Sequence, residues 1–122
     1  MKVKRDKIIE AIAKIIELTR ANILSWDAVN STAVKEKNSN DIISSVFSTL
    51  YREKKLRIFK RQYLSHYQGS IDWFEEVVLE IVDTQTSSLW TFPKEAIIND
   101  LLRTIKFKKS GADDFIDSLL EE

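Results

Sequence analysis

The sequence has no cysteine, one proline, one histidine and two glycines among its 122 residues. Without cysteine the chain forms no disulfide, no thiolate metal site and no cysteine nucleophile. Its glycines stand far apart, at 69 and 111, so it also lacks the glycine-rich loops that hold phosphates in nucleotide-binding proteins. A zinc site would have to gather carboxylates around His66 alone, and catalysis by that histidine would need an orienting acid that no motif supplies. We therefore predict no catalytic residues, no metal, no cofactor and no enzymatic activity.

Charge is balanced, and long apolar runs are missing. The 19 basic and 19 acidic residues give a formal net charge of zero, so no overall field favours nucleic acid or a charged surface. No apolar run approaches the roughly 20 residues that span a bilayer, which predicts no membrane association. The basic and then apolar start resembles a signal peptide, but Glu10, Lys14 and Glu17 interrupt the apolar run. We therefore predict a cytoplasmic protein of bacterial style that folds as a single domain over residues 1–122.

Three segments have the apolar spacing of an amphipathic helix. The first, at about 5–20, carries isoleucine at positions 8, 9, 12, 15 and 16, and it ends near Asn22, which tolerates a left-handed backbone. The second, at about 93–107, begins with the only proline, which suits the first helical position because no backbone donor is needed there. The third, at about 112–121, follows Gly111 and has four large apolar side chains on one face: Phe115, Ile116, Leu119 and Leu120. A helix this short is not stable alone in water, so that face needs a partner surface.

The segment 41–51 is ambiguous. Its apolar spacing suits a helix, whereas its β-branched, aromatic and serine residues favour a strand. We predict a strand at about 45–52 that pairs with the segment 56–64. That second strand is apolar at both even and odd positions, so the sequence leaves open which of its faces is buried.

The remaining strands are marked more clearly. Gly69 indicates a turn, and the strand after it alternates, with four side chains expected to face the core: Trp73, Val77, Leu79 and Ile81. A hairpin loop at 84–87 leads to a short fourth strand, in which Trp90 and Phe92 share a face. The whole pattern predicts an α+β fold with an N-terminal helix, a four-stranded antiparallel meander at about 45–92 and two C-terminal helices.

The segment 51–67 interleaves basic and aromatic residues, a composition found on sheets that bind single-stranded nucleic acid. The candidate contacts to phosphates and bases are Arg57, Lys60, Arg61 and Tyr63. The next strand carries five acidic residues: Asp72, Glu75, Glu76, Glu80 and Asp83. In an antiparallel hairpin these acids would lie opposite the basic residues and neutralise them. Nucleic-acid binding is therefore the second interpretation.

The preferred interpretation is a small, non-catalytic protein-interaction module with a regulatory or accessory role. Candidate interface residues lie on the C-terminal helix and on the outer sheet face: Phe115, Ile116, Leu119, Leu120, Phe59 and Tyr63. The expected partner is another protein or a second copy of the chain, because closed two-fold dimers are the commonest assemblies of soluble proteins.

Overall fold

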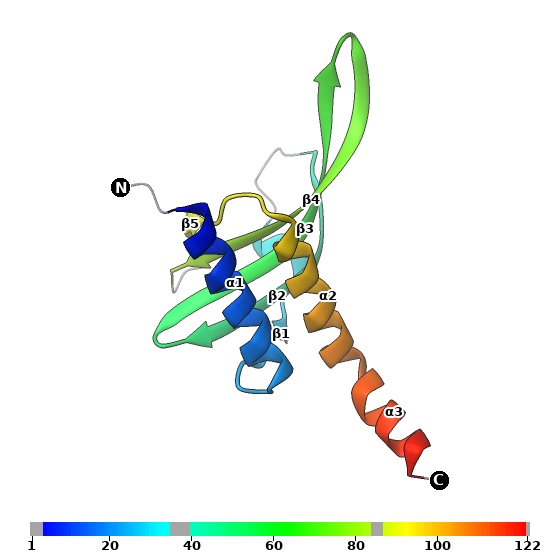
Figure 1. The fold of residues 1–122 in the computed structure, drawn as a ribbon. Helices are drawn as coiled ribbons and strands as arrows, with labels where there is room; N and C mark the ends of the chain where they lie inside the picture. Colours follow the sequence, from blue (N-terminus) through cyan, green and yellow to red (C-terminus); the bar gives the residue numbers. More distant parts are fainter. Residues whose placement is uncertain (1–3, 35–39, 84–86, 122) are drawn as a thin grey trace. The chain divides into compact units, whose positions relative to one another are not determined.

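A computed structural model describes residues 4–34, 40–83 and 87–121. It confirms the α+β class: one helix precedes an antiparallel sheet, and two helices follow it (Figure 1). The chain divides into two compact units. A helical unit contains Met1–Trp26 and Glu95–Glu122, and a sheet unit contains Asp27–Lys94. Folding of both units as one domain stays a prediction.

Helix α1 spans Arg5–Arg20, as predicted, and buries the face formed by Ile8, Ile12 and Ile16. Beyond its end, Asn22 has a positive φ of 62°, which confirms the expected left-handed residue. This turn lets the amides of the next two residues donate to the carbonyl of Leu18, so the last carbonyls of the helix have partners.

Helix α2 spans Ala96–Ser110 and buries Ile98, Leu101, Leu102 and Ile105 in the helical unit. The predicted start at Pro93 was wrong, because the backbone is still extended at Glu95, the N-cap residue. The fixed φ of proline suits an extended segment as well as the first turn of a helix. The Nε atom of Arg5 donates to Glu95 Oε1 at 2.7 Å, and this hydrogen bond holds the pKa of the Glu95 carboxyl below its ordinary value. The contact ties the start of α2 to the start of α1.

Helix α3 spans Ala112–Leu120, one residue shorter than predicted. Gly111 separates it from α2 with a left-handed φ of 76°, a conformation that glycine adopts without a Cβ penalty. Within the described residues, no helix is long and apolar enough to cross a membrane.

The sheet has five antiparallel strands in sequence order, and the predicted meander forms four of them. The strands are β1 Asp27–Ala28, β2 Ile42–Tyr51, β3 Lys54–Tyr67, β4 Ser70–Val82 and β5 Ser88–Thr91. A short 3₁₀ helix at Ser31–Ala33 follows β1. The sequence did not predict β1, because a two-residue strand shows no alternation. The predicted loop at 84–87 lies mostly outside the described residues.

Strand β2 settles the ambiguity of the segment 41–51 in favour of a strand. It pairs with β3 from Ile42 opposite Gln62 to Tyr51 opposite Lys54, which confirms the predicted partner. A bulge interrupts the pairing where Ser45 has a φ of 54°. The apolar spacing of this segment also fits a helix. Its β-branched and aromatic residues favour a strand, and pairing with β3 gives its backbone N–H and C=O groups hydrogen-bond partners.

Two tight turns join the long strands, and each has two central residues with positive φ. These residues are Arg52 and Glu53 between β2 and β3, and Gln68 and Gly69 between β3 and β4. This is the geometry of two-residue hairpin loops whose twist matches that of the strands. The prediction that Gly69 occupies a turn is confirmed.

The middle of β3 is buried on both faces, since the four consecutive residues from Leu56 to Phe59 are all buried. The sequence analysis placed Phe59 on an exposed outer face of the sheet. That prediction was wrong, because Phe59 is buried. In β4, Leu79 is fully buried as expected, but Trp73 is 53% exposed, so the prediction that Trp73 faces the core was wrong. Trp73 lies in the part of β4 that pairs with β3 alone, beyond the residues that pair with β5.

The two cores can be tested with one substitution in each unit. We expect Leu79→Ala in the sheet and Leu101→Ala in the helices each to lower the free energy of unfolding by about 2–5 kcal/mol, because both side chains are fully buried. Urea titration measures the loss. The matched controls are Leu50→Ala and Ile23→Ala, at exposed positions, where we expect changes within about 0.5 kcal/mol. Losses below about 1 kcal/mol at the buried positions would contradict this assignment of the core.

Candidate protein-interaction surfaces

Helix α3 exposes its whole apolar face. Four large apolar side chains are solvent-accessible, and no residue of the helix is buried: Phe115, Ile116, Leu119 and Leu120. These are the four interface candidates of the sequence, and the structure brings them together on one nine-residue helix. Exposed apolar side chains this close together commonly mark an interaction surface.

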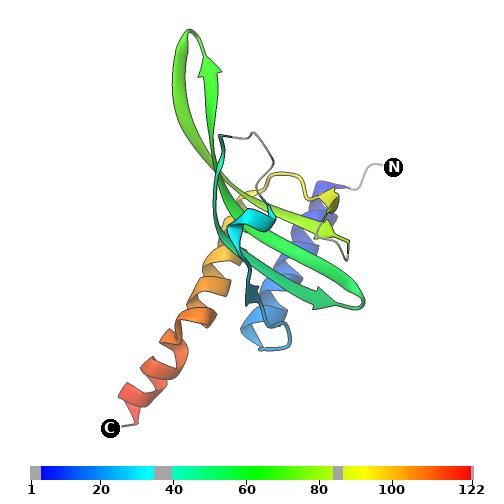
Figure 2. The same ribbon diagram turned by 180° about the vertical axis from the view of Figure 1, so that it is seen from behind.

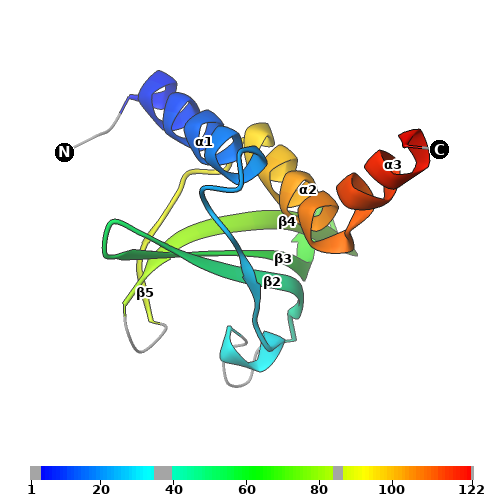
Figure 3. The same ribbon diagram turned by 90° about the horizontal axis from the view of Figure 1, so that it is seen from below.

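The junction between α2 and α3 is held by specific contacts. Lys108 Nζ lies 3.1 Å from Asp113 Oδ2, so an ion pair spans Gly111. The Ser110 hydroxyl donates to the carbonyl of Phe107 and accepts from the amide of Ala112. Because of these contacts, α3 leads away from α1 and does not fold back along α2, as Figures 1 and 3 show.

A second exposed apolar surface lies at the far end of the β3–β4 hairpin, residues 63–74, which we call the arm. β2 pairs with β3 only as far as Gln62, and β5 pairs with β4 only at Glu80–Val82. The arm is therefore a two-stranded ribbon that extends beyond the neighbouring strands (Figure 2). Among the described residues, no further strand pairs with its outer edges.

The arm is apolar on both faces. Tyr63 lies opposite Phe74, with ring centroids 6.0 Å apart, and Leu64 lies opposite Trp73 on the other face. Tyr67 and Ile71, nearer the tip, are more than half exposed. Such cross-strand pairs stabilise a ribbon, but an isolated two-stranded hairpin is marginal in water.

Of the arm residues, the sequence analysis singled out only Tyr63 as an interface candidate. The other exposed residues of the arm could have been found from the length of the two strands that flank Gly69. Both are longer than the strands before and after them, so their ends extend beyond those neighbours. Alternation along a strand shows which residues share a face, but it does not show where neighbouring strands end. For that reason the sequence assigned Trp73 to the core.

The basic residues proposed for nucleic-acid binding pair with acids of β4, as the antiparallel interpretation predicted, although Lys60 itself lies opposite Val77 and reaches Glu75 diagonally. Lys60 Nζ is 3.2 Å from Glu75 Oε1. Arg61 Nε is 3.4 Å from Glu76 Oε1 and 3.3 Å from Asp41 Oδ2, and its guanidinium lies over the ring of Tyr63. A phosphate would have to displace these carboxylates to reach either cation.

Arg57, the third basic candidate, is inside the sheet unit. Its side chain is 7% exposed, and its Nε donates to Glu80 Oε1 at 2.7 Å. Glu80 is equally buried and lies directly opposite Arg57 in the register of β3 and β4. Two buried charges are compensated here by each other, so Arg57 acts within the protein rather than on its surface.

The arm also separates the aromatic residues from the basic ones. Within residues 63–74 the only formally charged side chain is Asp72, and the cations of β3 all precede the arm. Tyr63 has the guanidinium of Arg61 over its ring, but the rings farther along the arm have no formally positive residue within 63–74 beside them to hold phosphates.

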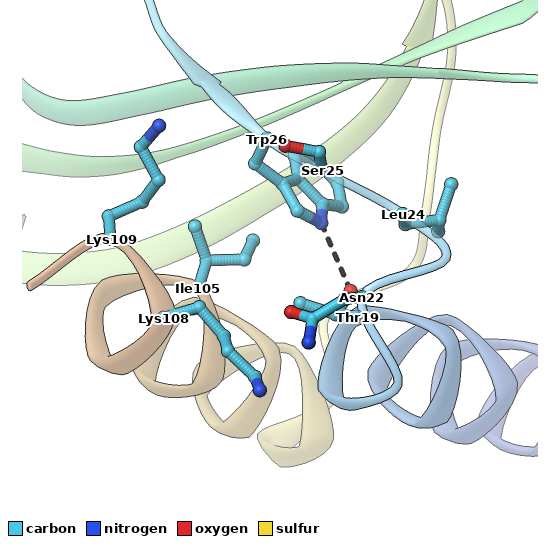
Figure 4. A pocket seen from close by; sticks show the side chains of 8 residues that line it. All are labelled: Thr19, Asn22, Leu24, Ser25, Trp26, Ile105, Lys108 and Lys109. Atoms are coloured by element: carbon cyan, nitrogen blue, oxygen red, sulfur yellow. Dashed lines mark hydrogen bonds between the residues drawn. The ribbon is translucent and has the colours of Figure 1, made fainter. Parts of the chain in front are cut away.

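The helical unit contains an open hollow of about 290 Å³ at the end of α1 (Figure 4). At its wall the indole Nε1 of Trp26 donates to Thr19 Oγ1 at 3.0 Å, and this hydroxyl donates to the carbonyl of Ile15. Lys108 and Lys109 also line the hollow, but Figure 4 shows their amino groups pointing in different directions. The residues of the hollow thus do not converge on one anionic ligand.

No protein-family model matches this chain, and comparisons with curated proteins and with solved structures also returned no match. Within the described residues, no three histidine or acidic side chains cluster as a metal site would require.

The buried ion pair can be tested by removing one partner or both. Arg57→Ala or Glu80→Ala alone should lower the free energy of unfolding by about 3–5 kcal/mol, because each leaves an uncompensated buried charge. Replacing both, as Arg57→Met with Glu80→Leu, should restore most of the loss. Urea titration is the measurement, and Lys60→Ala is the control, since breaking its exposed ion pair should cost less than about 1 kcal/mol. A double variant as unstable as the single ones would show that the pair does not act as a unit.

Nucleic-acid binding can be tested with a labelled oligothymidine and fluorescence anisotropy. We expect no tight binding at physiological salt, because carboxylates already neutralise Lys60 and Arg61. Binding that weakens steeply as salt rises, and that is lost in Lys60→Ala with Arg61→Ala, would reverse this interpretation.

Proposed function

We propose that this protein is a non-catalytic protein-interaction module with a regulatory or accessory role, and that α3 is its main binding element. The single observation that carries the proposal is the exposure of all four large apolar side chains of α3 while no residue of that helix is buried. An amphipathic helix that lays its apolar face in a groove of a partner is a common mode of protein recognition.

The energetics of α3 favour a partner. Burying apolar surface stabilises by roughly 25 cal/mol per Å², so four exposed large side chains represent several kcal/mol of unused stabilisation. Isolated helices shorter than about 12 residues are marginal in water, and α3 is shorter than that. Docking would bury the four large apolar side chains that α3 leaves exposed among the described residues.

The arm supports the same class of function. Its apolar residues lie on both faces, and its described backbone edges are unpaired, so it offers side chains and hydrogen-bonding groups together. Its near absence of charge suits a protein surface and does not suit the phosphates of nucleic acid.

Photo-crosslinking in the native cells tests the proposal. The photoreactive amino acid p-benzoylphenylalanine would replace Leu119 in α3 or Ile71 in the arm of the full chain. The matched controls are Leu50 and Ile23, which are exposed to a similar degree but stand outside both surfaces. We expect discrete protein adducts from Leu119, and adducts from Ile71 if the arm also binds, but none from the controls.

Mass spectrometry of the adducts identifies the partner, which is either another protein or a second copy of the chain. Either identity supports a protein-interaction role. The absence of any discrete adduct from both Leu119 and Ile71, with the protein expressed and folded, would overturn the proposal.

A further inference from the structure

We propose that the surface which receives α3 is the basic half of α2 on a second copy of this chain. Two copies would pack their α2–α3 segments antiparallel around a two-fold axis near Gly111, so that each α3 lies along the partner's α2. This inference rests on the proposed function, since it names the partner of α3.

The two helices carry opposite charges in adjacent blocks. Residues 101–112 contain four basic residues and no acidic one, namely Arg103, Lys106, Lys108 and Lys109. Residues 113–122 contain five acidic residues and no basic one, namely Asp113, Asp114, Asp117, Glu121 and Glu122. An antiparallel arrangement about the junction brings each acidic block against a basic block, whereas a parallel arrangement brings like charges together.

The basic block is accessible where a partner would bind. The side chains of Arg103, Lys106 and Lys109 are exposed, and Phe107 between them is 43% exposed. Arg103 also pairs with Asp100 of the same helix at 2.9 Å, so Lys106 and Lys109 are the cations of this block for which no ion pair within the described residues is recorded. At 1.5 Å per residue the basic stretch 103–109 is about 10 Å long and α3 about 13 Å, so the two helices match in length. Phe107 adds an apolar contact to a surface that is otherwise charged.

A hollow beside this stretch can receive an apolar side chain of the partner. It has a volume of about 460 Å³ and lies on the helical unit next to Phe107. Three of its six lining residues are basic and one is acidic: Arg20, Arg103, Thr104, Phe107, Lys108 and Asp113. A helix with both acidic and large apolar residues, such as α3, complements a hollow with this lining.

The chain cannot use its own α3 for this contact without breaking the junction. The Lys108–Asp113 ion pair and the two hydrogen bonds of Ser110 hold α3 as it leaves α2. Folding α3 back along α2 would also require a new backbone conformation at Gly111. A second copy meets the same basic surface with the junction intact, and the two-fold axis satisfies both contacts at once.

Charge reversal on each helix tests the proposal, with mass measured by light scattering at high micromolar concentration. The full chain is expected at twice the 14.2 kDa of one chain. The α3 variant Asp114→Lys with Asp117→Lys and the α2 variant Arg103→Glu with Lys106→Glu are each expected at the monomer mass, because like charges then face each other. Asp113 stays unchanged, since it pairs with Lys108 within the chain.

Mixing the two variants gives the sharpest result. In a mixture, each variant again offers the other an opposite charge at both contacts, so native mass spectrometry should detect a heterodimer that neither forms alone. The control variant Glu10→Lys with Glu17→Lys makes the same change of net charge as the α3 variant, at exposed positions of α1, and should remain a dimer. Far-UV circular dichroism of every variant checks that the helices are retained.

A monomeric full chain would overturn the inference, as would a dimer that survives both reversals, or variants that dissociate but do not recombine. These outcomes are separate from failure of the proposed function. A monomer whose Leu119 crosslinks to another protein in cells would leave the interaction role standing and reject only the second copy as partner.

Discussion

The continuous antiparallel register between β3 and β4 is the constraint on which the sheet unit depends. It runs from Lys55 opposite Val82 to Tyr67 opposite Ser70, and it sets Arg57 directly against Glu80. A slip of one residue would turn every side chain to the other face and would separate the two buried charges. The buried ion pair therefore opposes any other pairing of the two strands. The two-residue turn at Gln68 and Gly69 supports the same register from the other end.

This register also decides the chemistry of the surface. Because carboxylates of β4 pair with Arg57, Lys60 and Arg61, three cations of a strand that looks basic in the sequence are compensated in the sheet. Because the pairing continues beyond β2 and β5, the aromatic end of the same strand becomes a ribbon without flanking strands. One geometric feature thus sets carboxylates beside two of the candidate phosphate contacts and creates an exposed apolar arm.

The two exposed surfaces differ in chemistry, which suggests that they serve different contacts. The arm is almost uncharged and has apolar residues on both faces, so a partner would have to cover it from two sides. Helix α3 has one apolar face and an acidic remainder, so it suits a single basic and partly apolar groove. A protein that pairs with itself through α3 would keep its arms free for another partner.

Local sequence patterns predicted the three helices and four of the five described strands in their order, but not β1 or the short 3₁₀ helix. Isoleucine spacing marked α1 to the residue, alternation marked β4, and Gly69 and Gly111 marked a turn and a helix boundary, because these signals are local. The sequence also identified the four apolar residues of α3 as an unsupported face, since a short amphipathic helix needs a partner wherever it lies.

Whether a strand side chain is buried depends on the neighbouring elements that pack against it, which the pattern within the strand does not show. Phe59 and Trp73 are both large aromatic residues in alternating strands, yet the first is buried and the second is exposed. The difference depends on where β2 and β5 stop, a property of neighbouring strands that no pattern within β3 or β4 contains. In the same way, the sequence showed a basic residue at Arg57, but only the pairing with Glu80 placed it inside, because burial of a charge requires a partner that the fold brings from 23 residues away.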